Sequence, residues 1–150
     1  HGIPHFAISI ALRQKEEITS GLIFDPIKNE MFYAEKNNGA FFNNQRIRVS
    51  KKKKIEECLF ATGGKNKIDI MLNTRKSGSA ALDMAYVGSG RYDGYFQKYL
   101  NIWDIAAGII IVKEAGGMVN EIDLSIHKNI KIIASSLDIR SKLLEKLNNF

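Results

Sequence analysis

The change of pattern near residue 50 constrains the fold of this chain more than any other feature. Residues 1–50 contain short apolar segments that alternate with turn signals, which is typical of an antiparallel meander. Strands are expected at residues 6–12, 18–24, 30–35, 40–42 and 45–49. Asn37-Asn38-Gly39 and Asn43-Asn44 mark tight turns, because Asn and Gly tolerate a positive φ. The pattern predicts a sheet lobe that needs a cover on one face.

After a basic connector at residues 51–57, strands and helices alternate. Strands are expected at residues 58–61, 92–97, 118–122 and 131–134, and helices at residues 79–87, 104–115 and 138–147. In the first helix, Ala81, Ala85 and Gly88 permit close packing against a sheet. In the last helix, Asp138 is the expected N-cap. The alternation predicts an α/β lobe over residues 58–150, so the expected fold class is α+β with an α/β second half.

Length and cysteine content exclude several classes of protein. A chain of 150 residues can bury a core as one domain, or as two small lobes that share a sheet. It has no apolar run of the roughly 18 residues that a membrane-spanning helix needs. A single cysteine, Cys58, excludes an internal disulfide. These features predict a cytoplasmic protein with no membrane partner.

The positive charge of the chain is concentrated in the connector. The net charge is +6, and the lysines at residues 51–54 supply four of these charges. No aromatic side chain interleaves that run, as a platform for single-stranded nucleic acid requires. A solvated basic loop is therefore favoured over a phosphate-binding patch.

Several common catalytic motifs are absent from the sequence. There is no phosphate-binding loop, and Gly88-Ser89-Gly90 lacks the third glycine of a dinucleotide fingerprint. His1, His5 and His127 lack the spacing of metal ligands and are interpreted as terminal or surface residues. Cys58 has no histidine near it in the sequence and is interpreted as an inert core thiol.

The most informative carboxylate is Asp104, which stands where a strongly apolar helix is expected to begin. In a structural interpretation, Asp104 caps this helix and satisfies free backbone N–H groups at its positive end. In a functional interpretation, Asp104 points out of the helix start toward a metal, because Mg²⁺ prefers hard oxygen ligands. The two interpretations are compatible, since one oxygen can cap while the other coordinates.

The segment Trp103-Asp104-Ile105-Ala106-Ala107-Gly108 continues, after a fixed spacing, to Glu114-Ala115-Gly116-Gly117. It resembles the C-terminal signature of the inositol monophosphatase family of magnesium-dependent phosphatases. Residues 24–32, 39–50 and 75–85 are also similar to segments of that family. The resemblance covers nearly the whole chain, is closest to bacterial members, and implies a layered α-β-α-β-α fold.

The resemblance implies Mg²⁺-dependent hydrolysis of inositol monophosphate by a homodimer. Asp104 matches an aspartate that binds a metal near the leaving-group oxygen. Gly78, Ser79 and Ala80 match the segment that lines the sugar-alcohol ring, with Ser79 also capping the following helix. Gln97 matches a position that commonly carries a glutamate bonded to a ring hydroxyl; an amide keeps the hydrogen bonds and loses the charge.

Two further expectations follow from the resemblance. Trp103 is expected to pack beneath the site. The first metal-binding signature of the family, with the helices before it, is expected to be missing from the given sequence, because His1-Gly2 matches only its tail. The 150 residues are therefore expected to be inactive by themselves.

Two alternatives stay open at this point. Within the same superfamily, the substrate can be a sugar bisphosphate or a nucleotide bisphosphate. In a different class, the chain can be a non-catalytic protein associated with RNA or the transcription machinery, with the lysines at residues 51–54 in contact with the partner. A salt-dependent RNA affinity that disappears when these lysines become alanine would favour the second alternative.

Overall fold

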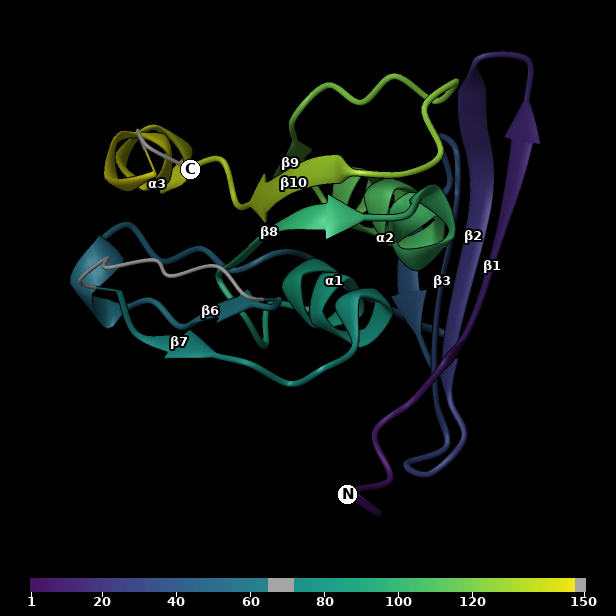
Figure 1. The fold of residues 1–150 in the computed structure, drawn as a ribbon, viewed down its shortest axis with the longest axis horizontal. Coiled ribbons are helices and arrows are strands. Elements are labelled where there is room, and N and C mark those ends of the chain that lie inside the picture. The colour runs from purple at the N-terminus through teal and green to yellow at the C-terminus, as the bar shows by residue number, and fades with distance from the viewer. Residues whose placement is uncertain (65–71, 148–150) are drawn as a thin grey trace.

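A computed structural model of the chain describes residues 1–64 and 72–147. Its elements form layers: a first sheet, the helices α1 and α2, a second sheet, and α3 on the far side of that sheet (Figure 1). These layers match four consecutive layers of the expected α-β-α-β-α arrangement. The division into lobes at residues 1–50, 51–57 and 58–150 stays a prediction.

The first sheet is the expected antiparallel meander. Its strands follow the chain in order: β1 (Ile8–Gln14), β2 (Glu17–Asp25), β3 (Glu30–Glu35), β4 (Gly39–Phe42) and β5 (Gln45–Arg46). Asn43 and Asn44 both have positive φ, which matches the right-handed twist of the flanking strands. The last strand is shorter than expected, because the chain leaves the sheet and the Val49 N–H donates to the Ala115 carbonyl.

The second sheet mixes parallel and antiparallel pairs. It contains β6 (Phe60–Thr62), β7 (Thr74–Arg75), β8 (Gly94–Leu100), β9 (Met118–Val119) and β10 (Ile130–Ser135), in the spatial order β7-β6-β8-β10-β9. Strand β6 pairs in parallel with β7 and β8. It begins two residues later than expected, because residues Ile55–Glu57 form a 3₁₀ turn closed by the Cys58 N–H. Strand β7 was not expected, since two residues carry no alternating pattern.

The three helices lie close to their expected ranges: α1 (Ala80–Gly88), α2 (Ile102–Glu114) and α3 (Arg140–Lys146). The N-cap of α1 is Ser79, as predicted. The prediction that Asp138 caps α3 is wrong: Ile139 occupies the N-cap position, without a side-chain cap. The apolar face of α3 is confirmed, because Ile139, Leu143 and Leu147 are buried against the second sheet.

Helices α1 and α2 touch at glycines between the two sheets. A Cβ atom at Gly108 of α2 would lie 2.4 Å from the Met84 Cβ of α1, and one at Gly88 would lie 2.7 Å from the Ile111 Cγ2 of α2. The small residue at position 88 therefore packs against a helix and not, as expected, against a sheet. On the other side, a Cβ at Gly21 of β2 would lie 2.8 Å from the Ala107 Cα, so α2 is the cover that the first sheet needs.

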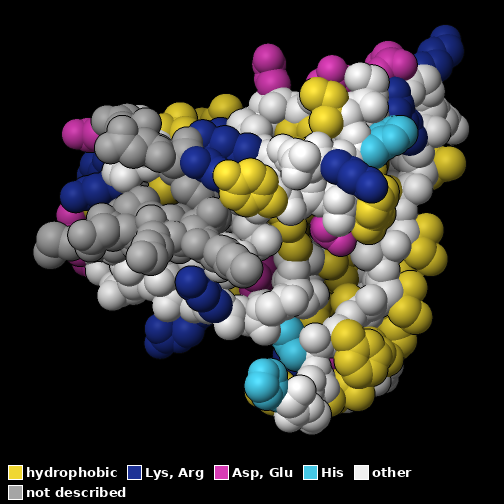
Figure 2. All heavy atoms as spheres, in the orientation of Figure 1, with side chains coloured by type: hydrophobic (Ala, Val, Ile, Leu, Met, Phe, Trp, Pro, Cys, Tyr) yellow, Lys and Arg dark blue, Asp and Glu magenta, His cyan; other side chains and the backbone are white. Residues whose placement is uncertain are grey.

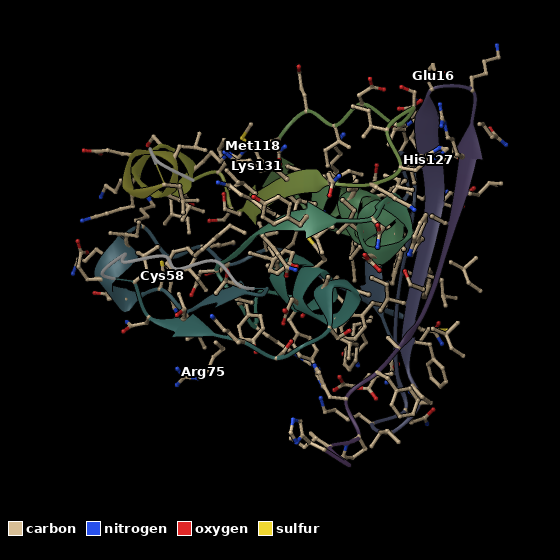
Figure 3. All side chains as sticks on the ribbon, in the orientation of Figure 1. Glu16, Cys58, Arg75, Met118, His127 and Lys131 are labelled. Carbon is tan, nitrogen blue, oxygen red and sulfur yellow. The ribbon has the colours of Figure 1, made fainter. Side chains whose placement is uncertain are left out.

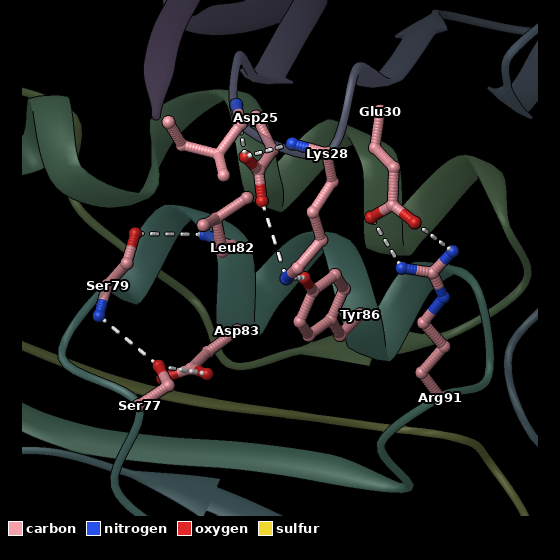
Figure 4. Close-up of polar contacts among 10 residues, drawn as sticks. Asp25, Lys28, Glu30, Ser77, Ser79, Leu82, Asp83, Tyr86 and Arg91 are labelled. Atoms are coloured by element: carbon pink, nitrogen blue, oxygen red, sulfur yellow. Dashed lines mark hydrogen bonds and ion pairs between the residues drawn. The ribbon is translucent and has the colours of Figure 1, made fainter. Parts of the chain in front are cut away.

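An arginine joins the turn after α1 to the first sheet. The Arg91 guanidinium donates to both oxygens of Glu30 at 2.7 and 2.8 Å (Figure 4). The same group stacks over the rings of Phe32, Phe42 and Tyr86. A bidentate pair of this kind fixes orientation as well as distance, so it sets the place of α1 relative to β3.

The outer strand β1 exposes an apolar row. Ile8, Ile10 and Leu12 are each more than half exposed, and hydrophobic side chains gather along this edge of the molecule (Figure 2). Within the part of the chain that the structure describes, no helix has the length and apolar character to cross a membrane.

Candidate functional site

A hollow of about 240 Å³ brings together every site residue that the sequence predicted. It lies where the end of β6, the starts of α1 and α2, and strand β8 meet. Its lining consists of Gly63, Gly64, Gly78, Ser79, Ala80, Asp83, Gln97, Leu100 and Asp104. The predicted residues thus line the same cavity, although they come from three separate stretches of the chain.

The wall formed by Gly78 and Ser79 depends on an unusual backbone turn. Gly78 has φ +98°, a value that favours glycine, whereas a Cβ atom there would meet nothing within 4 Å. Conformation, and not space, therefore requires glycine at this position. The Ser79 hydroxyl accepts a hydrogen bond from the Leu82 N–H at 3.4 Å, so Ser79 caps α1 and lines the hollow at the same time.

Asp83 is a lining residue that the sequence did not single out. Its side chain is buried, with 1% exposed, and its Oδ1 accepts a hydrogen bond from the Ser77 hydroxyl at 2.7 Å (Figure 4). Burial raises the pKa of Asp83 to about 7, against the opposing effect of this hydrogen bond. A polar residue among the apolar residues of the expected helix was the only signal, and an exposed helix face explains such a residue equally well.

Gln97 is fixed by a neighbour on the same face of β8. The Tyr95 hydroxyl donates to the Gln97 Oε1 at 2.6 Å, and Tyr95 is completely buried. Burial raises the pKa of Tyr95, so its hydroxyl stays protonated and remains a donor. On the other side, a Cβ atom at Gly63 would lie 2.1 Å from that oxygen. The absence of a side chain at Gly63 therefore leaves the room that the Gln97 amide occupies.

Asp104 is the third residue of α2 and not, as expected, the residue at which the helix begins. The helix begins at Ile102 with Asn101 as its N-cap, and the Asp104 Oδ2 accepts the Asn101 N–H at 2.9 Å. This contact is one half of a capping box, in which the third helical residue reaches back to the cap. The other oxygen, Oδ1, has no hydrogen-bond partner among residues 1–64 and 72–147. The interpretation of Asp104 as the N-cap is therefore wrong, because Asn101 holds that position; Asp104 supports the helix start through the capping box, and its second oxygen stays available.

The donor set for a metal is incomplete in the described part of the chain. No group of three or more His, Cys, Asp or Glu residues within residues 1–64 and 72–147 is placed to hold an ion. Mg²⁺ is usually bound through one or two carboxylates together with waters and phosphate oxygens. Around the hollow, the described residues therefore offer one half-buried carboxylate with an available oxygen, Asp104, and do not form a metal site by themselves.

A second hollow adjoins the first and shares Gly78, Ser79, Ala80 and Asp104 with it. Trp103 lines this second hollow and is 56% exposed, so the expectation that it packs beneath the site is wrong. His5, near the N-terminus of the given sequence, lines it as well and is half-buried.

Two other candidate side chains, those of His127 and Cys58, do not line the hollow. His127 and Cys58 are at opposite ends of the molecule (Figure 3). His127 is exposed, as expected. Cys58 is buried, its thiol contacts the Lys54 carbonyl at 3.2 Å, and burial raises the pKa of the thiol to about 11. A thiol in this state is a poor nucleophile at neutral pH, which agrees with the interpretation of an inert core residue.

The raised pKa of Asp83 predicts a pH-dependent stability. Because the folded protein binds this proton more tightly than the unfolded chain, the stabilisation is complete below pH of about 4 and is lost as the pH rises through about 7. Asp83→Asn removes the ionisation and keeps the acceptor for Ser77. We expect this variant to exceed the parent by about 1–3 kcal/mol in free energy of unfolding at pH 8, with a difference that shrinks toward pH 4.

Denaturant unfolding at pH 4, 6 and 8 measures this difference. Asp138→Asn, which makes the same change at an exposed position, is the control. A difference between Asp83→Asn and the parent that stays constant across the three pH values would contradict the prediction.

Comparison with known proteins agrees with the geometry. The model of the inositol monophosphatase family matches residues 1–149. The chain is 38% identical to the inositol-1-monophosphatase of Caulobacter vibrioides over 98% of its own length and 65% of that protein. It is 40% identical to the Nus factor SuhB of Haemophilus influenzae over 97% of its own length and 61% of that protein.

A solved structure shows the same fold. The extragenic suppressor protein suhB from Bartonella henselae superposes with a TM-score of 0.91 at 44% identity, over 99% of this chain and 66% of that one. The chain thus spans somewhat less than two thirds of the length of these proteins. With a family model that matches almost every residue and a solved fold that follows the whole chain, this protein belongs to the inositol monophosphatase family.

Proposed function

We propose that the protein hydrolyses inositol monophosphate to inositol and phosphate, with Mg²⁺ as its cofactor. One observation carries the proposal: Asp104, Gln97 and the segment Gly78–Ser79–Ala80 line a single hollow in a member of this family. A carboxylate, an amide and a hydroxyl around one small cavity suit a ligand that bears a phosphate at one end and hydroxyl groups at the other.

The helix starts at the hollow favour an anion. Helix α1 begins at Ala80 and α2 begins at Ile102, and Ala80 and Asp104 both line the cavity. The first turn of a helix carries free N–H groups and the positive end of the helix dipole. Two such ends beside one cavity favour a ligand that carries negative charge, with the phosphate placed at the start of α2 beside Asp104.

Three lining residues then have distinct tasks. Asp104 offers its free oxygen to a metal ion beside the leaving group, while its second oxygen keeps the start of α2 in place. Ser79 and Gln97 bind hydroxyl groups of the polyol, because each can both donate and accept a hydrogen bond. When bound, Mg²⁺ supplies Lewis-acid stabilisation of the phosphate and of the departing oxygen.

The proposal concerns the whole protein and not the 150 residues alone. Since the described residues provide one candidate ligand, the other metal ligands must come from outside them. We expect no turnover from the 150-residue chain. The homodimer that the resemblance implies stays a prediction.

Asp104→Asn tests the assigned role in the whole gene product. The asparagine keeps an oxygen for the Asn101 N–H, so the helix start is preserved, and it removes the charged metal ligand. Phosphate release from myo-inositol 1-phosphate in the presence of Mg²⁺ should fall about 100-fold or more in kcat/KM, with an unchanged unfolding midpoint. Fructose 1,6-bisphosphate serves as the second substrate in the same assay.

Two results of that assay would contradict the proposal. The first is a parent protein that releases no phosphate from myo-inositol 1-phosphate, whether or not it acts on fructose 1,6-bisphosphate. The second is an Asp104→Asn variant that keeps the turnover of the parent, which would separate the activity from this hollow.

A second candidate function is contact with RNA or the transcription machinery, and the name Nus factor of one relative favours it. The structure narrows which lysines can take part. Lys52 pairs with the buried Asp93 at 3.0 Å, and Lys54 pairs with Glu57 at 3.1 Å. Lys51 and Lys53 are exposed, and their side chains form no ion pair with any described residue.

The two exposed lysines can be tested without disturbing the ion pairs. If they contact RNA, the double variant Lys51→Ala/Lys53→Ala should weaken the binding of a fluorescein-labelled RNA and lower the salt slope by about two. Lys128→Ala, at an exposed position in the loop before β10, is the control. Equal affinity of the double variant and the parent would contradict RNA contact at the connector.

A further inference from the structure

We propose that Asp83 is a positioning residue for the polyol side of the hollow. Through the hydroxyl of Ser77, its carboxyl group holds the backbone of Gly78 and Ser79 in the conformation that lines the cavity. This inference rests on the proposed function for its effect on substrate, whereas the structural part stands on the contacts alone.

Two consecutive hydrogen bonds connect Asp83 to the Ser79 backbone through the Ser77 hydroxyl. The Ser77 hydroxyl donates to the Asp83 Oδ1 at 2.7 Å, and the same Ser77 oxygen accepts the Ser79 N–H at 3.2 Å (Figure 4). A hydroxyl that donates to one group and accepts from another fixes both partners, and each bond polarises the next. The conformation of the Ser79 peptide is thereby tied to a side chain four residues farther along the chain.

Asp83 is held in the core of the protein. Asp83 is 1% exposed and lies on α1, which packs against α2 through Gly88 and Met84. In contrast, Gly78 is exposed and Ser77 is half-buried. The turn at Ser77 and Gly78 is therefore the less buried end of this chain of hydrogen bonds, and Asp83 is its end in the core.

The two hydrogen bonds support the backbone at Gly78, which has little other support. Gly78 has φ +98°, and no neighbouring atom lies near its Cβ position to hold it by contact. Glycine loses more conformational entropy than other residues when it is held in one conformation. Hydrogen bonds at Ser77 and Ser79, on either side of Gly78, restrict it before a ligand arrives.

The positioning role of Asp83 differs from ordinary helix capping. The cap of α1 is made by the Ser79 hydroxyl with the Leu82 N–H, and Asp83 takes no part in it. Among residues 1–64 and 72–147, Asp83 forms no ion pair, and Ser77 is its one hydrogen-bond partner through the side chain. Burial of a carboxyl group with a single hydroxyl partner lowers the free energy of unfolding. A role at the hollow explains why a carboxyl group occupies this buried position.

Hydrogen exchange at the Ser79 amide tests the positioning directly in the whole gene product. Ser77→Ala and Asp83→Leu both break the chain of bonds, and each should speed exchange at this amide about tenfold or more. Asp83→Asn keeps an acceptor for Ser77 and should stay within about twofold of the parent. Ser89→Ala is the matched control, because that hydroxyl bonds the Tyr86 carbonyl at the other end of α1.

The kinetic arm measures the effect on substrate. Ser77→Ala and Asp83→Leu should raise KM for myo-inositol 1-phosphate about tenfold, with kcat changed less than about threefold, because the wall binds the polyol and not the reacting phosphate. The double variant should be no worse than either single variant, since both changes break one chain. Asp83→Asn should restore KM.

The outcomes distinguish the possible failures. Exchange at the Ser79 amide within about twofold of the parent in Ser77→Ala would overturn the proposal, and this variant decides it even if Asp83→Leu fails to fold. Faster exchange with an unchanged KM would overturn the role in substrate binding. If the parent protein has no phosphatase activity, the proposed function fails, and the exchange arm alone decides whether Asp83 positions the turn.

Discussion

The close contact between α1 and α2 is the constraint on which the site depends. The two helices meet at Gly108 and Met84, where even a methyl group on the glycine would overlap the neighbouring side chain. This approach brings the start of α1, with Ser79, beside the first turn of α2, with Asp104. A larger residue at position 108 would separate the two helix starts, and the hollow between them would open.

The two sheets hold this helix pair from opposite sides. Gly21 of β2 lets α2 lie directly on the first sheet, while Arg91 ties the end of α1 to Glu30 of β3. Strand β8 of the second sheet adds Gln97, held by the buried Tyr95 hydroxyl. The polar groups of the hollow therefore stand on rigid elements and are supported from behind, which is what a site must have to bind one ligand geometry.

The sequence predicts the local features of this site better than its tertiary features. The cap at Ser79 and the Trp103-Asp104 signature depend on neighbours in the chain, and the structure places both at helix starts. Asp83 could not be predicted, because its burial depends on packing against elements distant in sequence. The same limit explains Trp103 and β7: exposure of the first and pairing of the second are decided by the surrounding chain. Asp138 had the right residue type for a cap, but α3 begins two residues later.

A crystal structure of the whole gene product with myo-inositol 1-phosphate bound shows directly where the substrate lies. We expect the phosphate to lie beside Asp104 at the start of α2, and hydroxyl groups of the ring to lie within hydrogen-bond distance of Ser79 and Gln97. A ligand bound outside the hollow lined by these residues, with Asp104 turned away from it, would show that this hollow is not the substrate site.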